Sequence, residues 1–151
     1  MPKRILIPTD GSAVSELAAV QGVKFAKALG AQVVGFHAVP PYPSVYFGEP
    51  TPVAPLPPEV YEGNARNNAE KLLARIEGAA QAEGVPCRTT WVIDDMPAAA
   101  IVAAARKNRC DMIFMGAHGR AGIVRLLLGS QTWKVLTISR IPVLVYRAPE
   151  R

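Results

Sequence analysis

Residues 111–132 read Asp-Met-Ile-Phe-Met-Gly-Ala-His-Gly-Arg-Ala-Gly-Ile-Val-Arg-Leu-Leu-Leu-Gly-Ser-Gln-Thr, and this stretch decides the fold. It begins with a short apolar run, Met112 to Met115, which is typical of a fully buried parallel strand. Glycines follow directly, so the chain can turn sharply and leave backbone N–H groups uncovered for a ligand. Ser130 can cap a helix that we expect to run to about Ser139. The N-terminus of such a helix favours a phosphate.

The rest of the chain alternates apolar runs with segments of helical periodicity. We expect strands at residues 3–8, 31–39, 87–93, 112–115 and 142–146, and helices near 12–29, 58–83, 94–108 and 130–139. This alternation predicts a parallel, doubly wound sheet with right-handed crossovers. In the first helix, the residues expected on the buried face are Val14, Leu17, Ala18, Phe25, Ala28 and Leu29.

The glycines that follow the fourth expected strand have a defined spacing. Gly116, Gly119 and Gly129, with Ser130, give G-x2-G-x9-G-S. This spacing is neither a P-loop nor the dinucleotide-binding G-x-G-x-x-G. It closely resembles the nucleotide-binding motif of the universal stress protein family. The resemblance covers nearly the whole chain, because Ile5-Leu6-Ile7-Pro8-Thr9-Asp10-Gly11-Ser12 and Ile141-Pro142-Val143-Leu144-Val145 also match.

The family resemblance implies a Rossmann-like α/β fold, with residues 1–151 as one domain and strand order 3-2-1-4-5. It also implies that the chain binds ATP, with Mg²⁺ accompanying the phosphates. Adenosine would lie against Pro8, Thr9, Asp10 and Ala38, and the full set of implied nucleotide-binding residues adds Met115, Gly116, His118, Gly119, Arg120, Gly129, Ser130, Gln131 and Thr132.

Some of these residues also have purely structural interpretations. Asp10 can brace the turn before the first helix, and His118 can brace the glycine loop. Arg120 and Arg125 can screen phosphate charge or simply face solvent. His37, near the end of the second expected strand, is interpreted as structural. Asp94 and Asp95 could suggest a metal site, but acids at a helix start are far commoner.

The family resemblance favours a nucleotide-dependent regulator of the stress response. Hydrolysis needs a positioned base or water-orienting group, and nothing in the spacing points to a catalytic pair. We therefore assign no catalytic residue and expect slow ATP turnover at most. The alternative is a dimeric interaction module whose nucleotide site is empty.

Composition excludes several other classes of protein. Half of the residues are hydrophobic and 19% are charged, as in a globular domain. No apolar run approaches the roughly 18 residues of a membrane span, and Met1-Pro2-Lys3-Arg4 begins no signal peptide. We expect a cytoplasmic protein without membrane attachment. No basic run is interleaved with aromatic residues, which argues against nucleic acid. Cys87 and Cys110 have no metal or redox spacing and are expected to be reduced thiols.

The net charge of +5 is unevenly distributed. From Ala103 to the end, nine Lys and Arg residues stand against Asp111 and Glu150. A polyanionic ligand would prefer such a region. A solvated basic face is the alternative, and it suits most of these residues better.

Two further segments bear on partners. Residues 40–58 contain eight prolines and no periodicity, so we expect a long loop that is a lid, a partner-binding segment or a variable insertion.

Residues 142–146 form an apolar strand at a sheet edge in the implied order, and such an edge must be covered. Members of the family commonly dimerise by pairing this strand with its twofold mate. We therefore predict a homodimer, together with a protein partner that remains to be identified.

Overall fold

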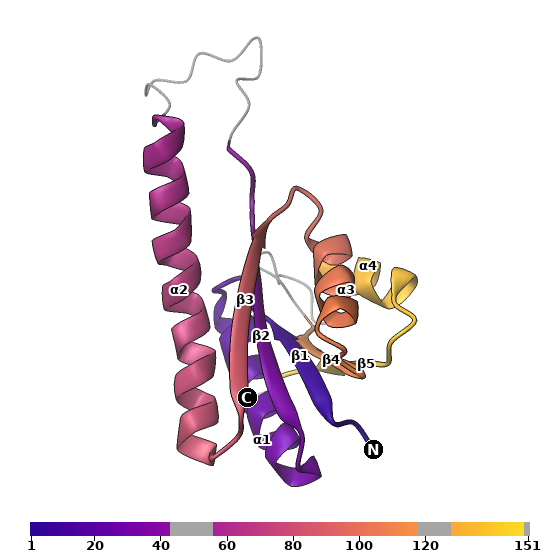
Figure 1. The fold of residues 1–151 in the computed structure, drawn as a ribbon. Coiled ribbons are helices and arrows are strands. Elements are labelled where there is room, and N and C mark those ends of the chain that lie inside the picture. The colour runs from indigo at the N-terminus through magenta and orange to yellow at the C-terminus, as the bar shows by residue number, and fades with distance from the viewer. Residues whose placement is uncertain (43–55, 118–127, 150–151) are drawn as a thin grey trace.

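The computed structural model of the chain describes residues 1–42, 56–117 and 128–149, which form one parallel sheet with helices on both faces (Figure 1). The strands are β1 (Arg4–Pro8), β2 (Gln32–Val39), β3 (Cys87–Ile93), β4 (Met112–Gly116) and β5 (Val143–Tyr146). The helices are α1 (Ala13–Leu29), α2 (Pro58–Glu83), α3 (Pro97–Lys107) and α4 (Ser130–Ile138). These bounds agree with the predicted ones to within a few residues.

The strands follow the order β3-β2-β1-β4-β5, and every neighbouring pair is parallel. The predicted α/β doubly wound sheet and its strand order are therefore confirmed. The chain order reverses between β1 and β4, at the centre of the sheet. Because parallel strands all point the same way, their carboxyl ends share one edge. Ligands of such sheets bind outside that edge, at the point of reversal.

Two apolar clusters fill the layers on either side of the sheet. Ile5 and Ile7 of β1 pack with α1 and α2, while Leu6 packs with α3 and α4. On β2, Val34 and Phe36 belong to the α3–α4 side. Side chains thus alternate between the two faces, as the pleat of a strand requires. This alternation assigns each residue at the carboxyl edge to one face.

Helix α1 lies close to the sheet because its buried face carries small residues. Its buried residues are Ser15, Ala18, Ala19, Gly22, Val23 and Ala26. The predicted face was partly wrong, since Leu17 is 39% exposed and Ala28 is exposed. Close approach explains the difference. A Cβ added to Gly22 would lie 2.8 Å from Ile7 Cδ1 and 2.9 Å from Phe114 Cδ1, so a larger side chain does not fit there.

Helix α2 packs on the sheet only with its later turns, and its start extends beyond the sheet (Figure 1). Two tyrosines tie that start to the end of β2. The Tyr61 hydroxyl donates to the Pro40 carbonyl at 2.6 Å, and the Tyr42 hydroxyl donates to the Leu56 carbonyl. Their rings meet edge to face at 5.3 Å. Most of the predicted proline-rich loop, residues 43–55, lies outside the described residues.

Helix α4 and strand β5 form the last unit of the sheet. Of α4, only Thr132 and Val135 are buried. Its other large side chains are exposed, and Trp133 is 63% exposed. β5 is an edge strand whose four residues are half-buried. None of the described helices combines the length and the apolar character of a membrane span.

Candidate functional site

Three of the residues expected to bind the nucleotide, Pro8, Ala38 and Met115, share one face of the sheet. The β1–β4 register pairs Leu6 with Ile113, so two residues further on Pro8 lies beside Met115. Pro8 is on the same face as Leu6 because side chains alternate, and Met115 and Ala38 pack on the same cluster as Leu6. All three therefore face α3 and α4 at the carboxyl edge.

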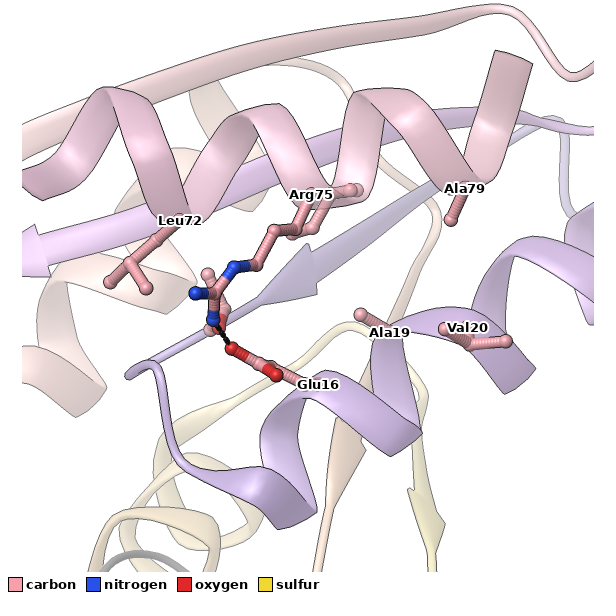
Figure 2. Close-up of a pocket in the computed structure, with 8 residues that line it drawn as sticks. Glu16, Ala19, Val20, Leu72, Arg75 and Ala79 are labelled. Atoms are coloured by element: carbon pink, nitrogen blue, oxygen red, sulfur yellow. Dashed lines mark ion pairs between the residues drawn. The ribbon is translucent and has the colours of Figure 1, made fainter. Parts of the chain in front are cut away.

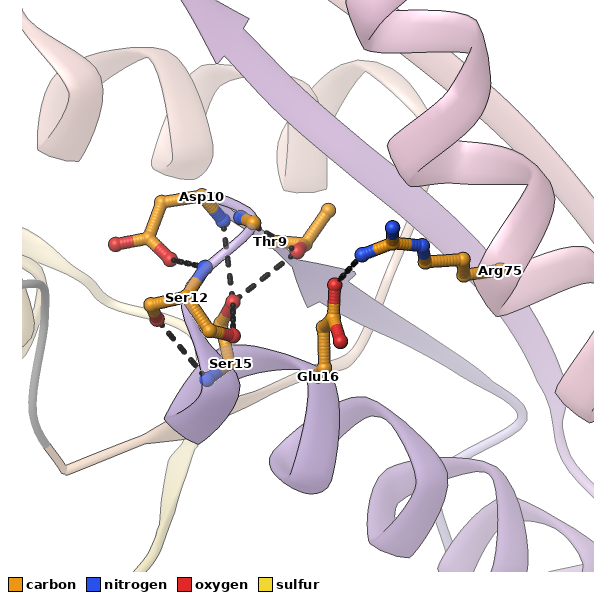
Figure 3. A network of polar contacts seen from close by, with 7 residues as sticks. Thr9, Asp10, Ser12, Ser15, Glu16 and Arg75 are labelled. Carbon is orange, nitrogen blue, oxygen red and sulfur yellow. Dashed lines mark hydrogen bonds and ion pairs between the residues drawn. The ribbon is translucent and has the colours of Figure 1, made fainter.

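The turn between β1 and α1 is held by a chain of side-chain hydrogen bonds (Figure 3). The Ser15 hydroxyl donates to the Ser12 carbonyl at 3.0 Å, so its oxygen accepts from the Thr9 hydroxyl at 3.1 Å. Thr9 Oγ1 accepts in turn from the Gly11 N–H at 3.2 Å. Asp10 Oδ1 accepts from the Ser12 N–H at 2.8 Å. The expected bracing role of Asp10 is therefore present.

Positive φ and helix capping complete this turn. Gly11 has φ 81°, in the left-handed region that favours glycine. Ser12 is the N-cap of α1, and its hydroxyl accepts from the Ser15 N–H at 3.2 Å. The Thr9 side chain faces α1, so this residue offers the opposite face of the sheet only its main chain.

The described ends of the segment that follows β4 are joined by backbone contacts. The Ala117 N–H donates to the Tyr146 carbonyl at 2.9 Å, and the Gly129 N–H donates to the Ala117 carbonyl at 2.6 Å. Gly116 packs against α1, because a Cβ there would lie 3.1 Å from Val14 Cγ1 and 3.3 Å from the Val14 carbonyl oxygen. Gly116 therefore has a packing reason to be glycine, independent of any ligand.

The start of α4 differs from the prediction. Gly129, not Ser130, is the N-cap, because the Gly129 carbonyl already accepts the first helical bond from Trp133 at 3.0 Å. Ser130 is the first helical residue and is exposed. No side chain caps this N-terminus within the described residues. The Thr132 hydroxyl donates to the Gly116 carbonyl at 2.9 Å and joins α4 to the end of β4.

Several predicted site residues cannot be placed. His118, Gly119 and Arg120, with Arg125, lie outside the described residues. Gln131 is half-buried at the start of α4, and its side-chain oxygen is buried without a hydrogen-bond partner in the described part of the chain. Pro8–Asp10, Ala38, Met115–Gly116 and Gly129–Thr132 are thus the part of the predicted site that the structure brings to one edge.

Most of the basic residues that can be placed lie at the opposite edge. Arg106, Lys107, Arg109 and Arg140 stand at the end of α3 or just before β4 and β5, where the strands begin. β1 spans five residues, or about 16 Å, between the two edges. That is about twice the Debye length at physiological salt. For these four residues the solvated basic face is the better interpretation.

A small groove between α1 and α2 lies on the other face of the sheet from Ala38 (Figure 2). An ion pair between Glu16 and Arg75 crosses it, and both side chains are substantially exposed, so the pair adds little stability. Thr9 also lines the groove. The other lining residues are Ala19, Val20, Leu72, Ile76 and Ala79. This groove results from helix packing, lies on the α1–α2 face and reaches the carboxyl edge at Thr9.

The remaining candidates from the sequence are the acidic pair before α3 and the two cysteines. The described residues contain no group of three His, Cys, Asp or Glu side chains that could hold a metal ion. Asp94 instead accepts from the Met96 N–H at 2.8 Å, just before α3. Cys87 and Cys110 are free, and burial raises the pKa of each thiol to about 11. Both therefore stay protonated and unreactive near neutral pH.

Two residues hold the edge through contacts that the sequence interpretation did not give: Ser15 was not singled out, and His37 was interpreted as structural without a partner. Ser15 connects Thr9, Asp10 and Ser12, and His37 is only 7% exposed, with Nδ1 2.8 Å from the Thr9 carbonyl oxygen. The Ser12-x-x-Ser15 spacing was an available signal for the first residue. A polar residue inside the apolar run of β2 was the signal for the second, and it was interpreted only as structural.

The parallel sheet with order β3-β2-β1-β4-β5 and helices on both faces defines a doubly wound α/β protein of the Rossmann-like class. The family model described as the universal stress protein family matches residues 1–147. The chain therefore belongs to the universal stress protein family.

Individual relatives match along almost the whole chain. A universal stress protein of Thermus aquaticus is 35% identical over 97% of this chain and 100% of its own length. The solved structure of a universal stress protein of Methanocaldococcus jannaschii is similar with a TM-score of 0.73, at 27% identity, and covers 99% of this chain and 98% of that one. A universal stress protein solved in complex with cAMP has a TM-score of 0.69 at 25% identity, covering 96% and 97% of the two chains.

Proposed function

We propose that this chain binds ATP with Mg²⁺ and acts as a nucleotide-dependent regulator of the stress response in the cytoplasm. The observation that carries the proposal is the convergence of Pro8, Ala38 and Met115 on one face, beside a start of α4 that no described side chain caps. The similar structure solved with cAMP supports an adenine nucleotide as the ligand class. Adenosine would lie against the three side chains, with Asp10 bonding its ribose or base.

The start of α4 fits a phosphate group. Ser12 caps α1, but no described side chain caps α4, so the first N–H groups of α4 are available. We assign the phosphates to the N–H groups of Ser130–Thr132 and to the exposed Ser130 hydroxyl, with Gly129 allowing the phosphate to approach the backbone. Mg²⁺ would be held chiefly by the phosphates, as is usual for this ion. His118, Gly119 and Arg120 complete the proposed set.

The proposed activity is a switch and not a metabolic reaction. A hydrolase needs a group placed to activate water at the γ-phosphate. In the described turn, one oxygen of Asp10 already accepts from Ser12, which suits a residue that positions the ligand. We therefore propose slow turnover at most, with the bound nucleotide setting the state of the protein.

The first test identifies the ligand directly. Freshly purified protein is denatured, released small molecules are weighed by mass spectrometry, and the protein is titrated calorimetrically with ATP and Mg²⁺. Asp10→Ala should weaken binding by about 1–3 kcal/mol, because a buried hydrogen bond to the ligand is lost. Asp95→Ala, just beyond β3, is the matched control and should bind normally. If wild-type protein releases no nucleotide and gives no heat, the proposal fails.

Gly129→Val tests the phosphate position separately from the fold. Gly129 has φ −56° and ψ 150°, which any residue adopts, so the variant should fold. A branched side chain there would nevertheless block the approach of phosphate to the backbone. We expect nucleotide binding to be lost. Wild-type affinity in the folded variant would place the phosphates elsewhere.

We also propose that the protein forms a homodimer through residues 142–146. β5 is an edge strand, and α4 beside it exposes Trp133, Leu136 and Ile138. Ile113 and Ala117 of the β4 side donate to the carbonyls of Pro142 and Tyr146, so Val143 and Val145 direct their N–H groups away from β4.

This register allows a selective test of the dimer. Val145→Pro removes an outward N–H without removing a bond to β4, and should give a monomer by analytical ultracentrifugation. Val145→Thr keeps the N–H and should remain dimeric. A dimeric proline variant would exclude pairing through β5. If wild type is dimeric and binds no nucleotide, the exposed α4 surface favours the second candidate function, an interaction module.

A further inference from the structure

The carbonyl groups at the ends of the two central strands both accept hydrogen bonds from side chains. Gly116, which ends β4, accepts from Thr132 at 2.9 Å. Thr9, just after β1, accepts from the His37 imidazole at 2.8 Å. The two bonds lie on either side of the point where strand order reverses. The second involves a residue with no assigned role in the nucleotide site.

His37 makes its bond where β1 and β2 separate. Their register ends at Pro8 and Phe36, and the Thr9 N–H still donates to the Phe36 carbonyl at 2.9 Å. Beyond it, β2 continues alongside β3 as far as Val39, while the chain from β1 turns into α1. A carbonyl oxygen only accepts, so Nδ1 of His37 carries the hydrogen. The imidazole therefore holds the peptide between Thr9 and Asp10 at the point where β1 and β2 separate.

The bond from His37 fixes the peptide unit that leads into Asp10. The oxygen of that unit belongs to Thr9 and is held by the imidazole at 2.8 Å. Its N–H belongs to Asp10 and donates to Ser15 Oγ at 3.4 Å. Both ends of one peptide plane are thus held, and the histidine provides the shorter contact. The direction in which the Asp10 side chain leaves the backbone depends on this plane.

His37 cannot act by touching a nucleotide on the proposed face. It pairs with Trp91, which packs on the α1–α2 cluster, while the next residue, Ala38, packs on the α3–α4 cluster. A ligand against Ala38 is therefore on the other side of the sheet. Any effect of His37 on binding must pass through the Thr9–Asp10 peptide.

We propose that His37 is a positioning residue of the nucleotide site, which orients Asp10 by holding the Thr9 carbonyl. This inference rests on the proposed function. Asparagine can place an amide N–H close to the position of Nδ1, whereas leucine fills a similar space without a donor. His37→Leu should therefore disturb Asp10, and His37→Asn should restore it.

The test has a ligand-free and a ligand-bound measurement. In ligand-free protein, His37→Leu should shift the NMR signals and raise the hydrogen-exchange rates of the Asp10, Gly11 and Ser12 amides. In calorimetric titrations with ATP and Mg²⁺, it should weaken binding at least tenfold. His37→Asn should return the amide signals toward wild type and bring the affinity within about threefold.

Thr89→Val is the matched control for a general loss of stability. It removes a 2.7 Å bond from β3 to Glu77 of α2. This variant should leave the Asp10 amides and the affinity unchanged. If the leucine protein does not fold, Ser15→Ala releases the other end of the same peptide and should weaken binding by a smaller factor.

Each outcome has a distinct meaning. If both His37 variants lose stability but bind ATP like wild type, or if the Asp10 amides do not respond to leucine, the positioning role is excluded. If asparagine fails to restore an affinity lost with leucine, the hydrogen bond is not the cause, and the proposal is equally excluded. If wild-type protein binds no nucleotide, the failure lies in the proposed function, and the positioning role falls with it.

Discussion

The turns after β1 and β4 end at the same edge of the sheet but hold their shapes differently. The first relies on side-chain bonds among Thr9, Asp10, Ser12 and Ser15. The described ends of the second are held by glycine packing and backbone bonds around Gly116, with one side-chain bond from Thr132. Ser12 accepts one N–H group of the first turn of α1, that of Ser15, whereas no described side chain caps the first turn of α4. The contrast indicates which helix start is available to an anion.

We expect the largest loss of stability when a side chain is added at Gly116, which packs closely against Val14. Gly116→Val should cost about 3 kcal/mol of unfolding free energy, because the new side chain meets the Val14 carbonyl as well as its side chain. The measurement is urea denaturation. Gly78 on α2 is the control, since a Cβ there meets nothing within 4 Å, and Gly78→Val should change stability by less than about 0.5 kcal/mol. Equal effects at both positions would refute the packing role.

A smaller effect should follow from removing the hydroxyl that joins α4 to β4. Thr132 is 3% exposed, and Thr132→Val leaves the Gly116 carbonyl without its donor. We expect a loss of about 1–2 kcal/mol by thermal or urea unfolding. Thr137→Val on the same helix removes an exposed hydroxyl and should be nearly neutral. A neutral Thr132→Val would mean that the backbone alone holds the second turn.

The smallest effect tests the difference in capping directly. Ser12→Ala removes the cap of α1 and should cost about 1 kcal/mol. Ser130→Ala, at the exposed start of α4, removes no capping bond and should change stability by less than about 0.5 kcal/mol. Unfolding curves of the two variants, measured under the same conditions, give the two losses of unfolding free energy for comparison. If Ser130→Ala costs as much as Ser12→Ala, the two helix starts do not differ as described.

The fold could be predicted because its signals are local and repeated. Apolar runs, helical periods and breakers such as Gly30 and Gly84 determine the elements, and both glycines end helices with positive φ. The buried face of α1 was harder to predict. Hydrophobicity favoured Leu17, but close approach to the sheet selected alanine and Gly22. Packing distance is a property of the tertiary structure and leaves little trace in a helical pattern.

The position of the nucleotide site stays a prediction, while the contacts that support the proposed residues are visible only in the structure. The strand order brings Pro8, Ala38 and Met115 together, and that order followed from the family resemblance. The bond from His37 to Thr9 joins residues 28 positions apart, so no local pattern reveals it. The N-cap of α4 was misplaced by one residue, because the chain enters that helix through Gly129 in an extended conformation that sequence does not specify.

The contacts among Tyr42, Leu56 and Tyr61 make the segment between residues 43 and 55 suited to engineering. The Tyr42 ring meets that of Tyr61 edge to face, and the Tyr42 hydroxyl donates to the Leu56 carbonyl at the other end of the segment. The two described ends of this segment are therefore joined to each other beside the start of α2. Doubling the length of a flexible closed segment costs only about 0.6 kcal/mol in chain entropy. A reporter peptide inserted between residues 43 and 55 should leave the strands and their carboxyl edge undisturbed.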